Sequence, residues 1–160
     1  LFLKPLKKSE FVEVSGNSGS VTDLGLFTTE LETADGIFIS LPNSTVWASA
    51  IKNFSRNAKR RMDITIGISY GDSIEDGLAA LRELAAEESR IITTPEPQYL
   101  VHTLADSSVN LQLRAWVPTP DYWDIYWKTQ RKVKERVESK GITIPFPQRD
   151  LHIISSNQKE

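Results

Sequence analysis

The first third of the chain alternates between short apolar runs and turn-forming residues. The β-prone runs are residues 11–14, 19–31, 37–41 and 47–54. Turn residues separate them at Gly16-Asn17-Ser18-Gly19, at Ala34-Asp35-Gly36 and at Pro42-Asn43, and the second of these is an Asp-Gly hairpin turn. Short strands at this spacing favour a small barrel or sandwich. We therefore predict an all-β domain over residues 9–56.

The pattern changes after Arg60 to strict alternation of apolar and polar residues. The apolar positions are Met62, Ile64, Ile66, Ile68 and Tyr70. This period of two predicts a strand. A helical stripe follows, formed by Ile74, Leu78, Leu81, Leu84 and Ala85. Asp72 stands three residues before Glu75, which resembles a capping box and predicts the start of a helix of about four turns.

Two further strands are expected after the extended Thr94–Pro97 connection. They cover residues 99–104 and 108–117 and are joined by a tight turn at Ala105-Asp106. In the second strand, apolar residues alternate with Asn110, Gln112, Arg114 and Trp116. One face of the sheet is therefore expected to be buried and the other to stay partly polar.

A second helix is predicted between Pro120 and Gly141, which suit its first turn and its C-terminal cap. Its expected core stripe is Trp123, Tyr126, Trp127, Val133 and Val137. A last β-prone run covers 151–154. The order β-α-β-β-α-β is that of a ferredoxin-like domain over residues 57–150, followed by a C-terminal strand and tail at 151–160. The predicted fold class is α+β.

Composition narrows the function classes. The 160 residues include 19 basic and 21 acidic side chains, so the net charge of -2 provides no global attraction to nucleic acid. The absence of cysteine excludes disulfides, thiolate zinc sites and cysteine nucleophiles, and it is typical of a reducing compartment. No apolar run is long enough to cross a bilayer, so we expect a soluble chain.

The N-terminal residues have an unusual order. Leu1-Phe2-Leu3 runs into Lys4, Lys7 and Lys8 without an initiator Met. Such an order is expected where a membrane helix has been removed just inside the cytoplasmic face, where lysines accumulate. A frayed tail or the remnant of a fusion explains it equally well. Residues 1–8 are interpreted as a membrane-proximal stub.

Candidate catalytic chemistry is sparse. His102 and His152 lie in separate predicted strands, without a carboxylate or second histidine at metal-site spacing. The Gly16–Gly19 segment lacks the Lys-Ser/Thr ending of a phosphate loop. Asp106-Ser107-Ser108 is better explained by turn chemistry than by nucleophilic catalysis. We predict no catalytic, cofactor or metal site, and a protein that is not an enzyme.

Two groups of charges leave alternatives open. Arg56, Lys59, Arg60 and Arg61 stand between the two predicted domains. They either solvate a hinge or border an opening whose ion preference they set. The second predicted helix is basic and the first mainly acidic, and such opposed charges would steer contacts between subunits.

Several sequence strings resemble the small-conductance mechanosensitive channel (MscS) family, in order and across nearly the whole chain. Those resembling its β domain are residues 19–29, 34–36, 41–44 and 53–56. Those resembling its α/β domain are residues 105–110, 114–116, 121–123 and 141–150. The membrane-spanning helices of the family are absent from this sequence. Lys128 and Thr129 stand where relatives more often have apolar residues.

The resemblance implies the cytoplasmic region of a homoheptameric channel at the bacterial inner membrane. Small Sm-like β barrels would form a collar, and α/β domains would enclose a chamber that ions and small osmolytes enter through side portals during hypoosmotic stress. It places Arg56, Asn57, Lys59 and Arg60 at these portals. The terminal residues Leu151, His152, Ile153 and Ile154 would join other copies in a small barrel. The implied partners are further copies of the chain and the membrane, and neither a cofactor nor nucleic acid is implied.

One alternative is a ferredoxin-like module that binds RNA or a protein through its open sheet face. Trp116 and Arg114 would then stack on bases. The aromatic signature of RNA-recognition domains is missing, and basic residues are not gathered on that strand. An enzyme would require a deep pocket that brings His102 or His152 against carboxylates.

Overall fold

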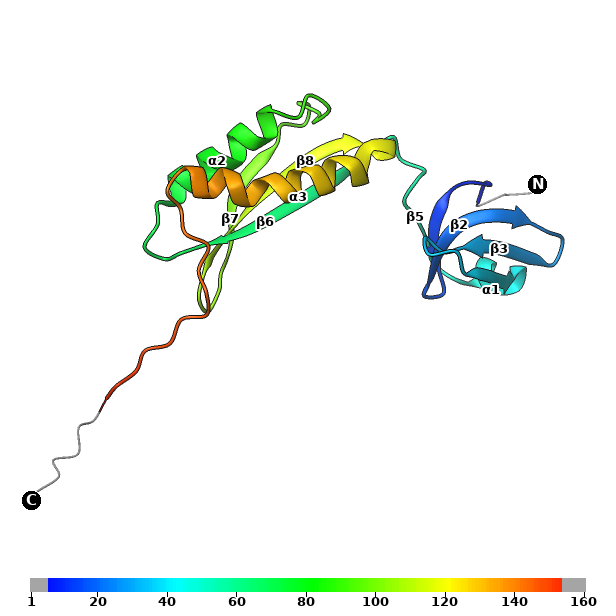
Figure 1. The fold of residues 1–160 in the computed structure, drawn as a ribbon. Helices are drawn as coiled ribbons and strands as arrows, with labels where there is room; N and C mark the ends of the chain where they lie inside the picture. Colours follow the sequence, from blue (N-terminus) through cyan, green and yellow to red (C-terminus); the bar gives the residue numbers. More distant parts are fainter. Residues whose placement is uncertain (1–5, 154–160) are drawn as a thin grey trace, which may run out of the picture. The chain divides into compact units, whose positions relative to one another are not determined.

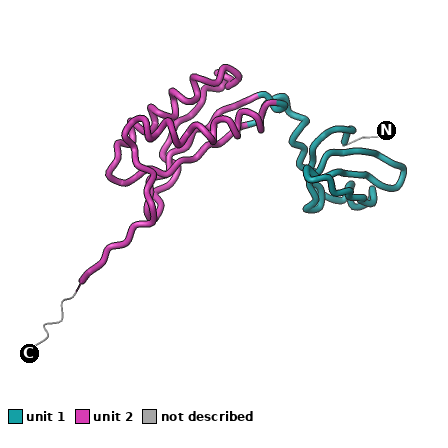
Figure 2. Tube along the Cα trace, viewed as in Figure 1, with its two compact units in different colours: residues 1–60, 118–120 teal, residues 61–117, 121–160 magenta. Residues whose placement is uncertain are grey.

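The computed structural model describes residues 6–153, and the chain folds into two compact units. The first unit runs to Arg60 and includes Pro118–Pro120, and the second comprises residues 61–117 and those from Asp121 onward (Figure 2). The first unit is mostly β, whereas the second combines a sheet with two long helices (Figure 1). The predicted α+β class is therefore confirmed.

The first unit is built on a five-stranded sheet whose paired neighbours are antiparallel. Its strands are β1 (Phe11–Val14), β2 (Asn17–Leu24), β3 (Thr28–Glu32), β4 (Phe38–Pro42) and β5 (Ile51–Asn53), in the order β4-β3-β2-β1-β5. Inward-facing side chains form one apolar core, namely Leu6, Val12, Val14, Val21, Leu31, Leu41 and Val46. Leu6 belongs to the segment that was interpreted as a stub, yet its side chain is buried in this core.

Two tight turns set the register of this sheet. Ser15 and Gly16 both have positive φ, 50° and 77°, which suits the mirror-image turns that join antiparallel strands. Because two residues suffice, β2 already begins at Asn17, inside the predicted break. At the second turn, Gly36 has φ 85° and its amide donates to the Thr33 carbonyl, as expected of the Asp-Gly sequence.

The prediction of a strand over residues 47–54 is partly wrong. Asn43–Ala48 forms the short helix α1, and only Ile51–Asn53 pairs as β5. The side-chain amide of Asn43, the first residue of α1, donates at 3.0 Å to the carbonyls of Gly25 and Leu26. These bonds also fix the turn that divides the predicted 19–31 run into β2 and β3.

The second unit contains a three-stranded sheet with helices packed on one face (Figure 1). Its elements are β6 (Lys59–Ile68), α2 (Ile74–Ala86), β7 (Gln98–Leu104), β8 (Val109–Pro118), a 3-10 turn at Thr119–Asp121 and α3 (Tyr122–Ser139). The strand order is β6-β8-β7, and β7 and β8 are antiparallel. Alternate residues of β6 and β8 share one core with α2 and α3, so the predicted periodicities are confirmed.

The N-terminal cap of helix α2 is Ser73, one residue later than the predicted cap, Asp72. The Ser73 hydroxyl, not Asp72, accepts the hydrogen bond from the Asp76 amide. The Asp72 carboxylate instead accepts from the Thr143 amide at 2.6 Å. Gly77 lets the helix approach the sheet, because an added Cβ would lie 2.4 Å from a methyl carbon of Leu111.

The predicted core stripe of α3 is wrong at its two tryptophans, whereas Tyr126 packs against the core. Trp123 and Trp127 are 56% and 61% exposed. The buried positions of the helix are Ile125, Thr129, Val133 and Val137. These positions recur every four residues and therefore lie on one face of the helix. The buried face that contains the two predicted valines thus continues through Thr129 and Ile125, not through the tryptophans.

The predicted C-terminal strand is not formed by the described residues. Leu151–Ile153 has no strand pairing, and Ile154 lies outside the described range. The preceding segment is tied to the second unit by hydrogen bonds of Thr143 and Gln148 and then leaves it. A strand needs a partner for its backbone, and residues 6–153 provide none there. A barrel formed with other copies remains a prediction, as do the finer Sm-like and ferredoxin-like assignments.

Candidate permeation lining and contact surfaces

The linker after β5 starts with an ion pair inside the first unit. Arg56 donates from Nε and Nη2 to the Glu10 carboxylate at 2.7 and 2.8 Å. The Lys7 amide donates to the same carboxylate at 2.8 Å. The Glu10 side chain is 11% exposed and that of Arg56 43%. The hydrogen bonds from Arg56, opposed in part by burial, lower the pKa of Glu10 to about 2. Glu10 is therefore ionised at physiological pH.

The other predicted portal residues belong to the same ordered segment. The Asn53 side chain accepts from the Arg56 amide at 2.9 Å. The Asn57 carbonyl accepts from the Thr119 hydroxyl. Lys59 and Arg60 open strand β6, and the Arg60 guanidinium lies 5.2 Å from the centre of the Phe54 ring. The segment has a defined conformation, and its location beside an opening remains a prediction.

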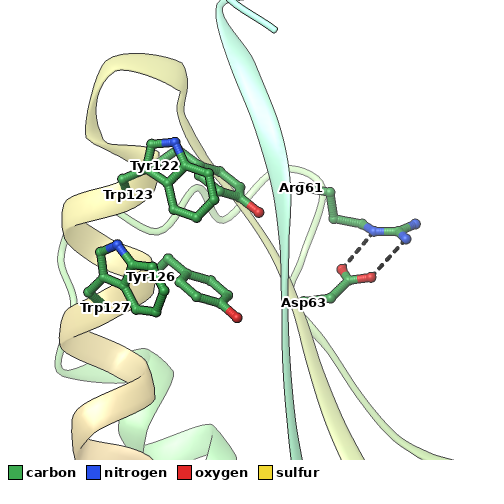
Figure 3. A pocket seen from close by; sticks show the side chains of 6 residues that line it. All are labelled: Arg61, Asp63, Tyr122, Trp123, Tyr126 and Trp127. Atoms are coloured by element: carbon green, nitrogen blue, oxygen red, sulfur yellow. Dashed lines mark hydrogen bonds and ion pairs between the residues drawn. The ribbon is translucent and has the colours of Figure 1, made fainter. Parts of the chain in front are cut away.

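A groove of about 440 Å³ in the second unit was not predicted (Figure 3). It is lined by Arg61, Asp63, Tyr122, Trp123, Tyr126 and Trp127. The two tryptophan rings stack at 5.8 Å, and the Tyr126 ring meets both edge-on at 5.7 and 4.9 Å. The rings brace one another, so they form a preorganised and partly exposed aromatic surface. The i, i+4 spacing of the tryptophans was visible in the sequence, but it was interpreted as core.

The groove is also bordered by a charged pair on β6. Arg61 donates from Nε and Nη2 to the Asp63 carboxylate at 2.8 and 2.9 Å. Figure 3 shows this pair across the strand from the four rings. Arg61 was grouped with the linker cations, yet its charge is balanced locally. Alternation could have revealed the partner, since residues two apart on a strand share a face.

The opposed charges of α2 and α3 are paired within the chain. Lys128 binds Glu88 at 2.8 Å, Lys132 binds Glu87 at 3.2 Å, and Arg136 binds both Glu83 and Glu87. These contacts join the two helices within the chain. A role of the charges in contacts between subunits stays a prediction. Lys128 thus has a local partner in Glu88, while its neighbour Thr129 is buried.

Glu88 is the centre of this network. Arg90 binds it at 2.8 Å and also contacts Asp121 and Asp124 near the start of α3. The hydrogen bond from Arg90, opposed by burial and aided by Lys128, lowers the pKa of Glu88 to about 2. The Glu88 carboxylate thus joins the end of α2 to the first turns of α3.

The remaining candidate residues lie apart from one another. His102 is exposed on β7 and His152 is exposed in the C-terminal segment. The Ser107 hydroxyl accepts from the Gln148 amide, so it anchors the chain. Over residues 6–153, no group of three or more acidic or histidine side chains is arranged to hold a metal ion. Within the same residues, no helix combines the length and apolar character needed to span a membrane.

Family profiles match both units of the chain. The profile described as "Mechanosensitive ion channel, beta-domain" matches residues 1–56. The profile described as "Mechanosensitive ion channel MscS, C-terminal" matches residues 62–144, just over half of the chain. The matched segments follow each other in the order expected from the sequence.

Curated relatives match across almost the whole chain. A small-conductance mechanosensitive channel of Edwardsiella ictaluri is 35% identical over 153 residues, which cover 96% of this chain and 54% of the relative. An uncharacterised MscS family protein of Archaeoglobus fulgidus is 34% identical over 146 residues, covering 91% of this chain and 52% of the relative. The chain thus spans about half the length of these relatives.

Solved structures agree with these matches. The closed-state crystal structure of Helicobacter pylori MscS has a TM-score of 0.90 at 28% identity, covering 97% of this chain and 62% of that one. The cryo-EM structure of Arabidopsis thaliana MSL1 has a TM-score of 0.76 at 18% identity, covering 91% and 55%, and supports the fold alone. The profiles, relatives and structures together show that this chain belongs to the MscS family of mechanosensitive ion channels.

Proposed function

We propose that this chain forms the wall of the cytoplasmic vestibule of a mechanosensitive channel at the bacterial inner membrane. Seven copies would surround an aqueous chamber that ions and small osmolytes enter through side portals during hypoosmotic stress. The observation that carries this proposal is the match of both units, in order, to Helicobacter pylori MscS at a TM-score of 0.90. The family consists of ion channels, which are not an enzyme class.

The aromatic groove supports self-association. Trp123 and Trp127 are more than half exposed, although they stack on each other and on Tyr126. Clustered exposed tryptophan and tyrosine rings are typical of protein contact surfaces, where they fill the apolar centre of an interface. We infer that a second copy of the chain covers this face, which would make α3 part of the wall between neighbouring subunits.

The linker supports a portal. Arg56, Asn57, Lys59 and Arg60 form an ordered segment with cationic side chains rather than a loose tether. Rings of like charge around an aqueous opening attract counter-ions and set ion preference. In a ring of seven copies, each cation of the segment would be repeated around the chamber.

Charge reversal in the complete channel tests the portal. The double variant Lys59→Glu/Arg60→Glu should make the channel more permeable to cations. In a salt gradient, its reversal potential should therefore move toward the equilibrium potential of the cation. The matched control is Lys52→Glu on β5, since Lys52 is paired with Glu13 outside the linker. A reversal potential equal to that of the unaltered channel would contradict the portal assignment. The linker cations would then only solvate a hinge between the two domains.

The alternative of an RNA-binding sheet face gains no support. Arg114 donates to the Gln112 side chain at 2.6 Å, and Gln112 donates to the Thr65 hydroxyl at 2.9 Å. The polar groups of this face therefore hydrogen bond to one another. Micromolar, salt-dependent binding of single-stranded RNA would be needed to favour that alternative.

A further inference from the structure

The first cation of the linker carries its own counter-ion. Glu10 lies 46 residues before Arg56 in the chain, yet its carboxylate receives both forked donors of that guanidinium. The backbone amide of Lys7 adds a third hydrogen bond. This carboxylate is mostly buried, so solvent ions have little access to it.

We propose that Glu10 is a selectivity-determining residue, because it neutralises Arg56 and so limits the positive charge that the linker presents to permeating ions. The inference rests on the proposed function, in which the linker borders a portal. Arg56 would then help to shape the portal without adding net charge to it.

The geometry makes the effect of the pair specific. Arg56 is 43% exposed, so its charge would act on the solution if Glu10 did not balance it. The backbone at Arg56 is fixed separately, because its amide donates to the Asn53 side chain at 2.9 Å. Removing the carboxylate charge should therefore leave the guanidinium near its present position. Within a Debye length of about 8–10 Å, a balanced pair has a much weaker field than a single unbalanced charge, and beyond that distance salt screens both.

Three variants of the complete channel test the proposal by electrophysiology in a KCl gradient. Glu10→Gln should raise the ratio of chloride to potassium permeability roughly fourfold, because one added charge per subunit acting through water at about 10 Å favours chloride about twofold and disfavours potassium about twofold. Arg56→Gln should lower the ratio, because it leaves the Glu10 charge alone. The double variant Glu10→Gln/Arg56→Gln restores charge balance, so its ratio should return to that of the unaltered channel.

The control is Glu13→Gln, which removes the same charge from an exposed pair with Lys52 farther along β1 and should change the ratio less. An unchanged ratio in Glu10→Gln would overturn the proposal. If Glu10→Gln does not assemble, an unchanged ratio in Arg56→Gln would overturn it equally. Failure of the proposed function is distinguishable, because the Lys59→Glu/Arg60→Glu channel would then also keep its reversal potential.

Discussion

At the scale of single residues, the fold depends on polar side chains whose partners are distant in the sequence. Glu10 with Arg56, and Glu88 with Lys128, each join elements about 40 residues apart. Asn43 uses its amide group on the turn between β2 and β3. Sequence patterns supplied the residue types, but the pairing could not be predicted, because it depends on how loops and helix ends approach in three dimensions.

The Glu88 network makes a prediction about acid stability. The pKa of Glu88 is lowered from 4.5 to about 2, so folding favours its charged form. Its contribution should be complete above about pH 4.5 and lost as the pH falls toward 2. Glu88→Gln should reduce the free energy of unfolding of the second unit at pH 7 by about 1–3 kcal/mol and weaken its dependence on pH over that window.

Urea denaturation monitored at several pH values would measure this effect. Glu96→Gln is the matched control, since Glu96 is exposed in the connection before β7 and should change the stability little. An unfolding profile of Glu88→Gln that parallels the unaltered chain from pH 7 to pH 2 would contradict the assigned role of the network.

At the scale of elements, periodicity was sufficient wherever one face is buried against a sheet. The strands β6 and β8 and the helix α2 have the predicted core residues, with two exceptions: Tyr70, which follows β6 and is 56% exposed, and Ile74 in the first turn of α2. Helix α3 differs because the stripe predicted from its aromatic residues is not the stripe that is buried. The buried line instead passes through Ile125 and Thr129, and a threonine there is a weak apolar signal. Helix α1 was not predicted because a helix of six residues is too short for a repeating apolar pattern to show in the sequence.

The two faces of α3 should respond differently to truncation. Ile125→Ala removes a fully buried side chain and should destabilise the second unit by about 2–5 kcal/mol. Trp127→Ala removes a ring that is 61% exposed and should cost about 1 kcal/mol or less in the isolated chain. Chemical denaturation at low protein concentration measures both.

The same Trp127→Ala variant should weaken association of the complete channel, whose mass can be followed by light scattering on dilution. A tryptophan variant as unstable as Ile125→Ala would mean that the ring is part of the core after all. A channel that dissociates no more readily than the unaltered one would remove α3 from the proposed interface.

At the scale of the whole molecule, the order of elements and the recurring family strings were enough to predict the α+β class and the family. The C-terminal segment was not predictable in the same way, because its apolar residues have no partner within the described chain. Leu151 and Ile153 are 81% and 90% exposed, and they are separated by the polar His152. Alternation of this kind is typical of a strand that buries one face, and we propose that other copies of the chain provide the partner.

Deleting residues 151–154 should therefore reduce assembly without unfolding either unit. Residues 151–153 belong to neither core, so the circular dichroism and melting temperature of the units should stay unchanged. The mass of the complete channel in detergent should shift from that of the proposed seven-subunit ring toward smaller species as the protein is diluted. Leu151→Ser/Ile153→Ser tests the same point without shortening the chain and should have the same effect if apolar burial drives closure. His152→Ser is its control, because it changes the alternate, polar position. A seven-subunit mass that persists on dilution in both the deletion and the double serine variant would exclude this segment from the closure of the ring.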